Sequence, residues 1–232
     1  SALYFAAEKI EQKARKIAAH QLEASEADIE FTGGIFRVSG TDREITLKDV
    51  AKASFMPAKL PAGVEPGLFE TATFAPDQDT YPNGSHVCEV EIDPDTGAIK
   101  IQGYKVVDDV GVMINPTIVK GQIHGGIAQG VGQILMEQIV YDRDSGQLLS
   151  GSFMDYAMPR ADNFGDIEIA SNEIPTKRNP LGVKGAGEAG TVGAMPAMMN
   201  AIMNALSDVG VTSLDMPATP DRVWRAIRDA AL

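Results

Sequence analysis

Apolar residues recur with the period of a helix in four parts of the chain. Over residues 2–24 they return every three to five positions, at Leu3, Ala6, Ile10, Ala14, Ile17 and Leu22. Charged residues fill the gaps, which predicts an amphipathic helix with one buried face. Residues 117–136 and 191–208 predict two more helices, the first rich in glycine and the second in methionine and alanine. The run Thr219-Pro220-Asp221 is typical of a helix start and predicts a last helix.

Alternation of apolar and polar residues predicts strands in several shorter segments. Residues 85–93 and 99–108 alternate in this way, and the D-P-D-T-G turn between them predicts a hairpin. We expect short strands within 28–46 around a Gly-Gly turn, a hairpin of 139–141 with 147–149, and strands at 70–74 and 167–171. Thr46 is placed to start a short helix that runs to about Ala53. Without regular βαβ spacing, this order predicts an α+β fold of mixed helices and antiparallel hairpins.

Composition narrows the classes of protein that the chain can belong to. The 232 residues are 44% hydrophobic, enough for a sizeable core in one large domain or two small ones. A net charge of -12 argues against nucleic acid as the main partner, because phosphate binding needs a basic face. The sequence contains no apolar run long enough to span a membrane.

The few cysteines and histidines limit the metal chemistry that this chain can carry out alone. Cys88 is the single cysteine, which excludes an intrachain disulfide and a cysteine-ligated iron–sulfur cluster within the chain. It fits a cytoplasmic setting, and we interpret it as structural. His20, His86 and His124 are too far apart in sequence to form a metal-binding pair, so we expect no protein-ligated metal. Any metal is expected to arrive with a cofactor.

Glycine is concentrated in two windows. Residues 121–132 contain Gly121, Gly125, Gly126, Gly130 and Gly132, and residues 182–193 contain Gly182, Gly185, Gly187, Gly190 and Gly193. Each glycine inside a helix costs about 1 kcal/mol relative to alanine, so something must offset that cost. Either two helices pack closely, or backbone N–H groups approach a ligand. Gln122, Gln129 and Gln133 suit a polar cofactor but equally suit the surface of a tight helix crossing.

The second window also contains one acid, Glu188. The pattern alone favours an acid that the dipole of the following helix stabilises. The run 185–190 matches the G-x-G-x-x-G fingerprint of dinucleotide-binding proteins. That motif needs a hydrophobic strand before it, whereas P-T-K-R-N-P-L-G-V-K precedes it here. A nucleotide-binding module that uses G-A-G-E-A-G therefore stays as the alternative.

Six segments in order resemble one known family. They are V-C-E-V-E-I-D-P-D-T-G (87–97), D-D-V-G-V-M-I-N-P (108–116), G-Q-I-H-G-G-I-A-Q-G-V-G-Q (121–133), F-M-D-Y-A-M-P-R-A-D (153–162), N-P-L-G-V-K-G-A-G-E-A-G-T-V-G-A (179–194) and P-A-T-P-D-R-V-W-R-A-I (217–227). They resemble the molybdenum-cofactor-binding large subunit of the molybdenum hydroxylases, the xanthine dehydrogenase, aldehyde oxidase and carbon monoxide dehydrogenase group. The bacterial carbon monoxide dehydrogenase-like branch is the most similar.

The resemblance implies roles for individual residues. Glu188 matches the active-site base, which takes a proton from the hydroxyl on molybdenum before oxygen attacks the substrate carbon. Phe74 falls where the family has an aromatic residue near the substrate channel. No residue of this chain is implied as a metal ligand. The implied cofactor-binding positions are Gly121, Gln122, Lys184, Gly185, Ala186 and Gly187.

The resemblance also implies cofactors and partners. The cofactor is molybdopterin with molybdenum, in the cytosine dinucleotide form, and electrons pass to 2Fe-2S clusters and FAD on partner subunits or domains. Residues 1–232 correspond to the C-terminal portion of the molybdopterin-binding domain, so we expect a fragment that needs the N-terminal part of the subunit. The complete enzyme is expected to be a cytoplasmic dimer of heterotrimers that oxidises a small molecule. A non-catalytic scaffold paralogue is a further alternative.

Overall fold

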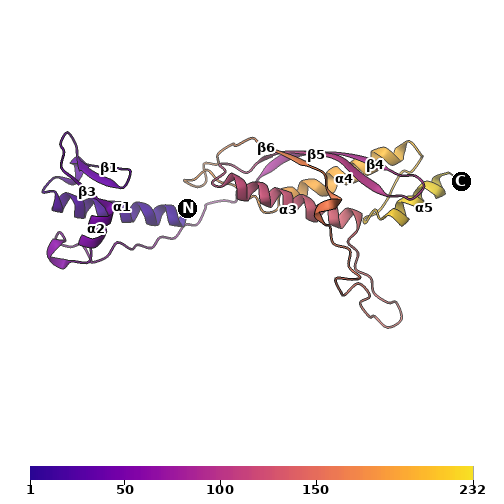
Figure 1. Ribbon diagram of the computed structural model, residues 1–232, viewed down its shortest axis with the longest axis horizontal. Helices are drawn as coiled ribbons and strands as arrows, with labels where there is room; N and C mark the ends of the chain where they lie inside the picture. Colours follow the sequence, from indigo (N-terminus) through magenta and orange to yellow (C-terminus); the bar gives the residue numbers. More distant parts are fainter. Residues whose placement is uncertain (232) are drawn as a thin grey trace. The chain divides into compact units, whose positions relative to one another are not determined.

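The computed structural model describes residues 1–231 and divides into two compact units, Ser1–Asp77 and the residues from Gln78 onward (Figure 1). We call them the N-terminal and the C-terminal unit. Each unit contains helices and a three-stranded sheet, so the α+β prediction is confirmed. None of the described helices is long and apolar enough to cross a membrane.

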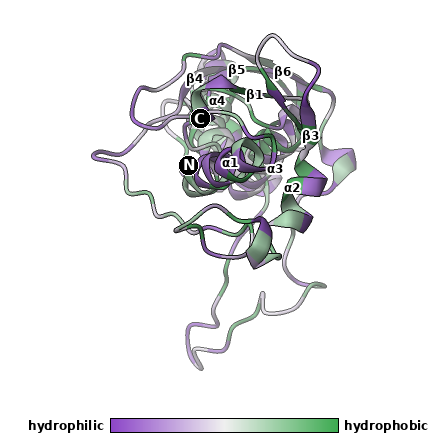
Figure 2. Cartoon of the chain, turned by 90° about the vertical axis from the view of Figure 1, so that its left-hand side faces the viewer, coloured by the Kyte–Doolittle hydropathy of each residue, from purple (hydrophilic) through white to green (hydrophobic). Residues whose placement is uncertain are grey.

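The N-terminal unit packs two helices on an antiparallel sheet. Its elements are α1 (Ala2–Gln21), β1 (Ile29–Thr32), β2 (Ile35–Val38), β3 (Glu44–Thr46) and α2 (Leu47–Ala53), with 3-10 turns at Glu26–Asp28 and Pro57–Lys59. The strand order is β1-β2-β3. Both helices carry hydrophilic and hydrophobic residues (Figure 2), and their buried faces include Ile17 and Val50. Thr46 caps α2 as predicted, because its side chain accepts a hydrogen bond from the Asp49 N–H at 3.1 Å.

The strand predicted at residues 70–74 is wrong. These residues form no helix or strand, and α1 holds them instead of a sheet. The Lys9 ammonium donates to the Thr71 carbonyl at 2.8 Å, and the Phe74 ring lies 5.8 Å from that of Phe5. The alternating pattern therefore reflects an extended segment that alternates between a helix surface and solvent.

The C-terminal unit contains the candidate site. Its elements are β4 (Asn83–Ile92), β5 (Ile99–Asp109), α3 (Pro116–Leu135), β6 (Ile167–Ser171), α4 (Ala189–Ser207) and α5 (Pro220–Ala230), with a 3-10 turn at Ala161–Asn163. The structure contains the strands predicted at 85–93, 99–108 and 167–171 and the helices predicted at 117–136 and 191–208. Their ends lie within two residues of the predicted ones. The last helix forms too, although the Thr219 side chain makes no cap bond within the described chain.

Two details of this unit differ from the prediction of antiparallel hairpins. β5 pairs with β4 in the antiparallel direction but with β6 in parallel. This is possible because the chain passes through α3 before it returns to the sheet, and parallel neighbours need such a crossover. Residues 139–149 form a turn with one bridge, Tyr141 to Leu148, instead of two strands.

One face of the sheet β4-β5-β6 is covered by α3 and α4 (Figure 1). Tyr104 and Val106 of β5 point into this layer and are almost fully buried. They meet Ile127 of α3 and Met198 of α4, which are also buried. Because successive strand residues face opposite sides, every second residue near the end of β5 points at the helices.

Candidate functional site

Three glycines allow α3 and α4 to cross at backbone contact. A Cβ atom on Gly126 would lie 2.8 Å from the Thr191 nitrogen and 3.0 Å from the Gly190 Cα atom. A Cβ on Gly130 would lie 2.8 Å from the Cβ of Ala194. Such distances are too short for any side chain, so close packing explains these glycines.

The remaining glycines of the two windows include several that face open space. A Cβ on Gly121, Gly125 or Gly185 would meet no other described atom within 4 Å. Packing within the described chain therefore gives no reason for their lack of a side chain. Of the two explanations left open above, close packing applies to one set of glycines, and approach to a ligand remains for the other.

The fold brings the two glycine windows together. The Gln122 Oε1 atom lies 3.9 Å from the position that a Cβ on Gly187 would take. Gly121, Gln122 and Gly187 are exposed, and Ala186 is half-buried. Two groups of predicted cofactor-binding positions, on α3 and in the segment before α4, thus lie next to each other. Their residues expose backbone groups and the Gln122 amide.

Glu188 occupies the position that caps the N-terminus of α4. Its side chain is exposed and makes no capping hydrogen bond to the described part of the helix. It lines a pocket of about 260 Å³, together with Pro82, Asn83, Gly84, His86, Asp108, Ala189, Val192 and Gly193. We call this the Glu188 pocket. The Glu188 carboxylate therefore does not act as a helix cap within the described chain.

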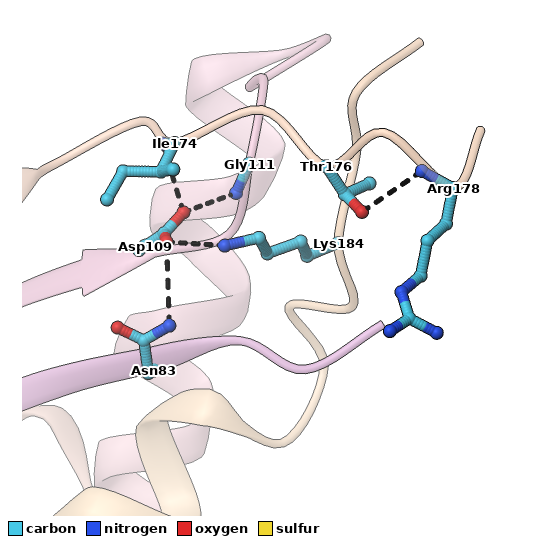
Figure 3. Close-up of polar contacts among 7 residues, drawn as sticks. All are labelled: Asn83, Asp109, Gly111, Ile174, Thr176, Arg178 and Lys184. Atoms are coloured by element: carbon cyan, nitrogen blue, oxygen red, sulfur yellow. Dashed lines mark hydrogen bonds and ion pairs between the residues drawn. The ribbon is translucent and has the colours of Figure 1, made fainter. Parts of the chain in front are cut away.

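Lys184 is tied to the end of β5. Its ammonium lies 2.5 Å from the Asp109 carboxylate, and the two side chains are 13% and 4% exposed. Asp109 also accepts hydrogen bonds from the N–H groups of Gly111 and Ile174, so the donors converge on one carboxylate (Figure 3). Burial raises the pKa of Asp109, but these bonds outweigh it and hold the pKa below its ordinary value. The Lys184 ammonium is thus paired within the described chain, and the predicted role of Lys184 in cofactor binding stays a prediction.

The same tie fixes the backbone that leads to Glu188. The Lys184 N–H donates to the Val110 carbonyl at 2.9 Å, and Val183 bridges to Gly111. The Asn179 side chain bonds to both backbone groups of Val183, at 2.8 and 3.1 Å. This segment is a loop and not a strand packed in a βαβ unit, so G-A-G-E-A-G lacks the context that dinucleotide binding requires.

Phe74 is the residue predicted near a substrate channel, and that role stays a prediction. It belongs to the N-terminal unit, where it packs on Phe5 of α1.

Cys88 is half-buried beside Met198, with 3.0 Å between the two sulfur atoms. Burial, with a smaller effect of the Glu89 charge, raises the pKa of its thiol to about 11. The predicted structural role of Cys88 agrees with this setting.

The sequence alone did not point to His86 and Asp108. The His86 Nε2 atom lies 3.4 Å from Asp108 Oδ1, and the two side chains are 5% and 3% exposed. The His86 Nδ1 atom lies 2.7 Å from the Tyr104 hydroxyl. The available signal was the pair of acids at the end of an apolar strand, V-V-D-D-V, because acids there must find partners inside the protein.

Comparison with known proteins places these features in a family. Residues 1–165 match the family model described as molybdopterin cofactor-binding domain. The chain is 40% identical over 230 residues to the carbon monoxide dehydrogenase large chain of Hydrogenophaga pseudoflava, covering 99% of this chain. It is 43% identical over 225 residues to the nicotine 6-hydroxylase large subunit of Paenarthrobacter nicotinovorans, covering 96% of it.

The fold is similar to that of a solved enzyme as well. The structure of the Cu,Mo-CO dehydrogenase in its carbon monoxide reduced state aligns with a TM-score of 0.88 at 36% identity, over 98% of this chain. The chain spans 28% of the length of each of these three proteins.

Proposed function

We propose, from the premise that this chain belongs to the molybdopterin cofactor-binding domain family of the molybdenum hydroxylases, that it is part of a molybdenum-dependent oxidoreductase. In this proposal residues 1–232 are the C-terminal portion of the molybdopterin-binding domain of a larger subunit. The chain covers 28% of the length of each relative, which supports a larger subunit.

The residues of the C-terminal unit fit a large polar cofactor. Gly121, Gly125 and Gly185 present backbone without a side chain and without a described neighbour, which lets a ligand come close. Gln122 adds an amide that both donates and accepts hydrogen bonds. We assign cofactor binding to Gly121, Gln122, Lys184, Gly185, Ala186 and Gly187. Lys184 contributes by holding the loop in place.

Glu188 is the proposed proton acceptor, and one observation carries this assignment. Its carboxylate is exposed and unused as a helix cap, and it follows Gly185 by three residues, where a Cβ would meet no described atom within 4 Å. When bound, the molybdenum cofactor supplies the two-electron oxidation of a substrate carbon. Glu188 accepts a proton at a carboxylate oxygen during that reaction, as a general base. The backbone bonds around Val183 and Lys184 keep that carboxylate at the edge of its pocket.

The finer features of the complete enzyme are proposed from the relatives. These relatives are named as a large chain and a large subunit, which supports a complete enzyme of more than one subunit. We propose that the partner subunits carry 2Fe-2S clusters and FAD for electron transfer. We propose a cytosine dinucleotide form of the cofactor, water as the source of oxygen, a small-molecule substrate and a cytoplasmic dimer of heterotrimers. Phe74 remains a candidate for the substrate channel. The isolated chain is expected to retain no molybdenum, and stoichiometric molybdenum in it would contradict this proposal.

Replacement of Glu188 in the complete enzyme tests the assignment. Glu188→Gln keeps the shape but removes the base, so kcat should fall by about 10²–10⁴-fold while the molybdenum content stays constant. Asp229→Asn, an exposed acid on α5, is the matched control and should leave kcat unchanged. Equal activity of the two variants would favour the scaffold paralogue. Saturable binding of NAD(P) to the chain would favour the nucleotide-binding module.

A further inference from the structure

The wall of the Glu188 pocket contains a buried carboxylate with one oxygen unused. Asp108 lines the pocket, and its side chain is 3% exposed. Its Oδ1 atom faces His86, whereas Oδ2 has no hydrogen-bond partner among the described residues. A buried acceptor without a partner costs about 1–3 kcal/mol, and more when it is charged. This oxygen therefore calls for a donor that the chain does not provide.

Two glycines make room for the Asp108–His86 pair. A Cβ atom on Gly193 of α4 would lie 2.6 Å from Cε1 of the His86 ring. A Cβ on Gly84 of β4 would overlap the Asp108 carboxylate and approach the Val107 carbonyl to 2.7 Å. The space for the imidazole and the carboxylate thus depends on the absence of side chains at both positions.

Hydrogen bonding fixes the direction of the pair. The Asp108 carboxylate accepts hydrogen bonds and cannot donate, so we assign the Tyr104 hydroxyl as the donor to His86 Nδ1, 2.7 Å away. A neutral imidazole then carries its proton on Nε2, which faces Asp108 Oδ1. Asp108 Oδ2 is the atom of this group that has no partner among the described residues, and Asp108 lines the pocket that Glu188 also lines.

Water is the donor that best fits this pocket. A water molecule takes up about 30 Å³ in the liquid, so a pocket of about 260 Å³ has room for several. Glu188, Asn83 and Asp108 offer polar partners, and a buried water needs two to four of them. The apolar part of the lining, which includes Pro82 and Val192, cannot provide a donor.

We propose that water in the Glu188 pocket bonds to Asp108 Oδ2 and links Glu188 to the Asp108–His86–Tyr104 chain, as the route by which Glu188 loses the proton it has gained. The inference rests on the proposed role of Glu188 as a base. The Glu188 carboxyl gives its proton to a pocket water, which passes one of its own protons to Asp108 Oδ2. Glu188 regains its negative charge, and Asp108 becomes neutral until the proton returns through the pocket to solvent. Asp108 carries the proton in this scheme, and His86 is a positioning residue.

Nitrogen NMR of the histidine rings tests the link without any cofactor. The chain has three histidines, and His20 lies in the N-terminal unit as an internal reference. With ¹⁵N-labelled histidine, His86 should show the neutral tautomer with the proton on Nε2. Glu188→Gln should move the His86 ring signals and leave those of His20 in place, whereas Asp229→Asn should move neither. The link would be overturned by a proton on His86 Nδ1, or by His86 ring signals that do not move in Glu188→Gln.

Kinetics of the complete enzyme separate this inference from the proposed function. Asp108→Asn keeps the size of the side chain but cannot carry the proton. It should lower kcat by about tenfold and raise the solvent deuterium isotope effect, with KM and molybdenum content unchanged. His86→Gln should act in the same direction and serves if Asp108→Asn does not fold. If both variants match the wild type while Glu188→Gln is inactive, the relay is refuted and the base remains. If Glu188→Gln is fully active, the base assignment itself is refuted.

Discussion

Gly125 and Gly126 are neighbours on α3, but alanine should have opposite effects at the two positions. Gly125 is exposed, and a Cβ there meets nothing described within 4 Å. Gly126 is buried against the backbone of α4, and a Cβ there would lie 2.8 Å from the Thr191 nitrogen. The pair isolates packing from helix propensity, because both substitutions add the same methyl group to the same helix.

The magnitudes follow from these distances. Gly125→Ala removes the conformational cost of glycine and should raise the free energy of unfolding by about 1 kcal/mol. Gly126→Ala gains the same amount but drives a methyl group into backbone atoms, which cannot rotate away. Overpacking of a core costs about 1–3 kcal/mol, and contact with backbone places it at the upper end. The net loss for Gly126→Ala should be about 2 kcal/mol.

Thermal and urea unfolding of the chain measure both effects. A change of 1 kcal/mol corresponds to a shift in Tm of about 2–4 °C at this size. Gly125→Ala should therefore unfold at a higher temperature than the wild type, and Gly126→Ala about 4–8 °C below it. A loss of stability in both variants would refute the assignment of open space at Gly125. A gain in both would refute the close helix crossing.

The same variants test cofactor binding in the complete enzyme, through its molybdenum content. If the open face of α3 is where a ligand approaches, Gly125→Ala should lower the molybdenum content even though it stabilises the fold. Greater stability with weaker loading cannot come from unfolding. Full molybdenum content in the Gly125→Ala enzyme would exclude Gly125 from the contact surface.

Two further predictions concern groups inside the C-terminal unit. Lys184→Met leaves the buried Asp109 charge unpaired and should cost about 3 kcal/mol in urea unfolding, whereas Lys105→Met, in an exposed pair with Glu168, should cost less than about 1 kcal/mol. The folded pKa of Asp109 is lowered in the wild type, so the Lys184→Met deficit should vanish as the pH falls through that value and should be complete above the higher folded pKa that Asp109 has in the variant; a deficit that grows in acid would contradict the ion pair. Cys88, with its pKa raised to about 11, should react with a thiol reagent at pH 8 at least about 100-fold more slowly than in urea, and equal rates would show that it is not held in the core.

Local pattern was sufficient for most elements of the fold. The helices at 117–136 and 191–208 and the hairpin at 85–108 were predicted to within two residues, because their periodicity is set by the layer that they bury. The strand at 70–74 failed because an extended segment on a helix has the same alternation as a strand in a sheet. The parallel pairing of β6 could not be predicted, since its partner lies about 60 positions earlier and no local signal specifies it.

The candidate site divides in the same way. Glu188 could be proposed from the sequence because it belongs to a motif of consecutive residues that resembles the family's. His86 and Asp108 are 22 positions apart, and only the register of β4 on β5 brings them together, with Gly84 opposite Asp108 and Val106 opposite His86. No motif of consecutive residues contains that pair. A pairing that depends on register is visible only once the sheet is built.

The two glycine windows show why both explanations were needed. The helices α3 and α4 touch at Gly126 and Gly190, and this contact sets where α4 begins. Glu188 lies two residues before Gly190, so the crossing also determines where the carboxylate stands relative to Gln122. Gly126 and Gly190 thus allow the two helices to cross closely. Gly121, Gly125 and Gly185 have no described neighbour, and they belong to the same two windows as the proposed base. A side chain at Gly126 would therefore displace Glu188 as well as loosen the core, which makes packing and chemistry inseparable at this crossing.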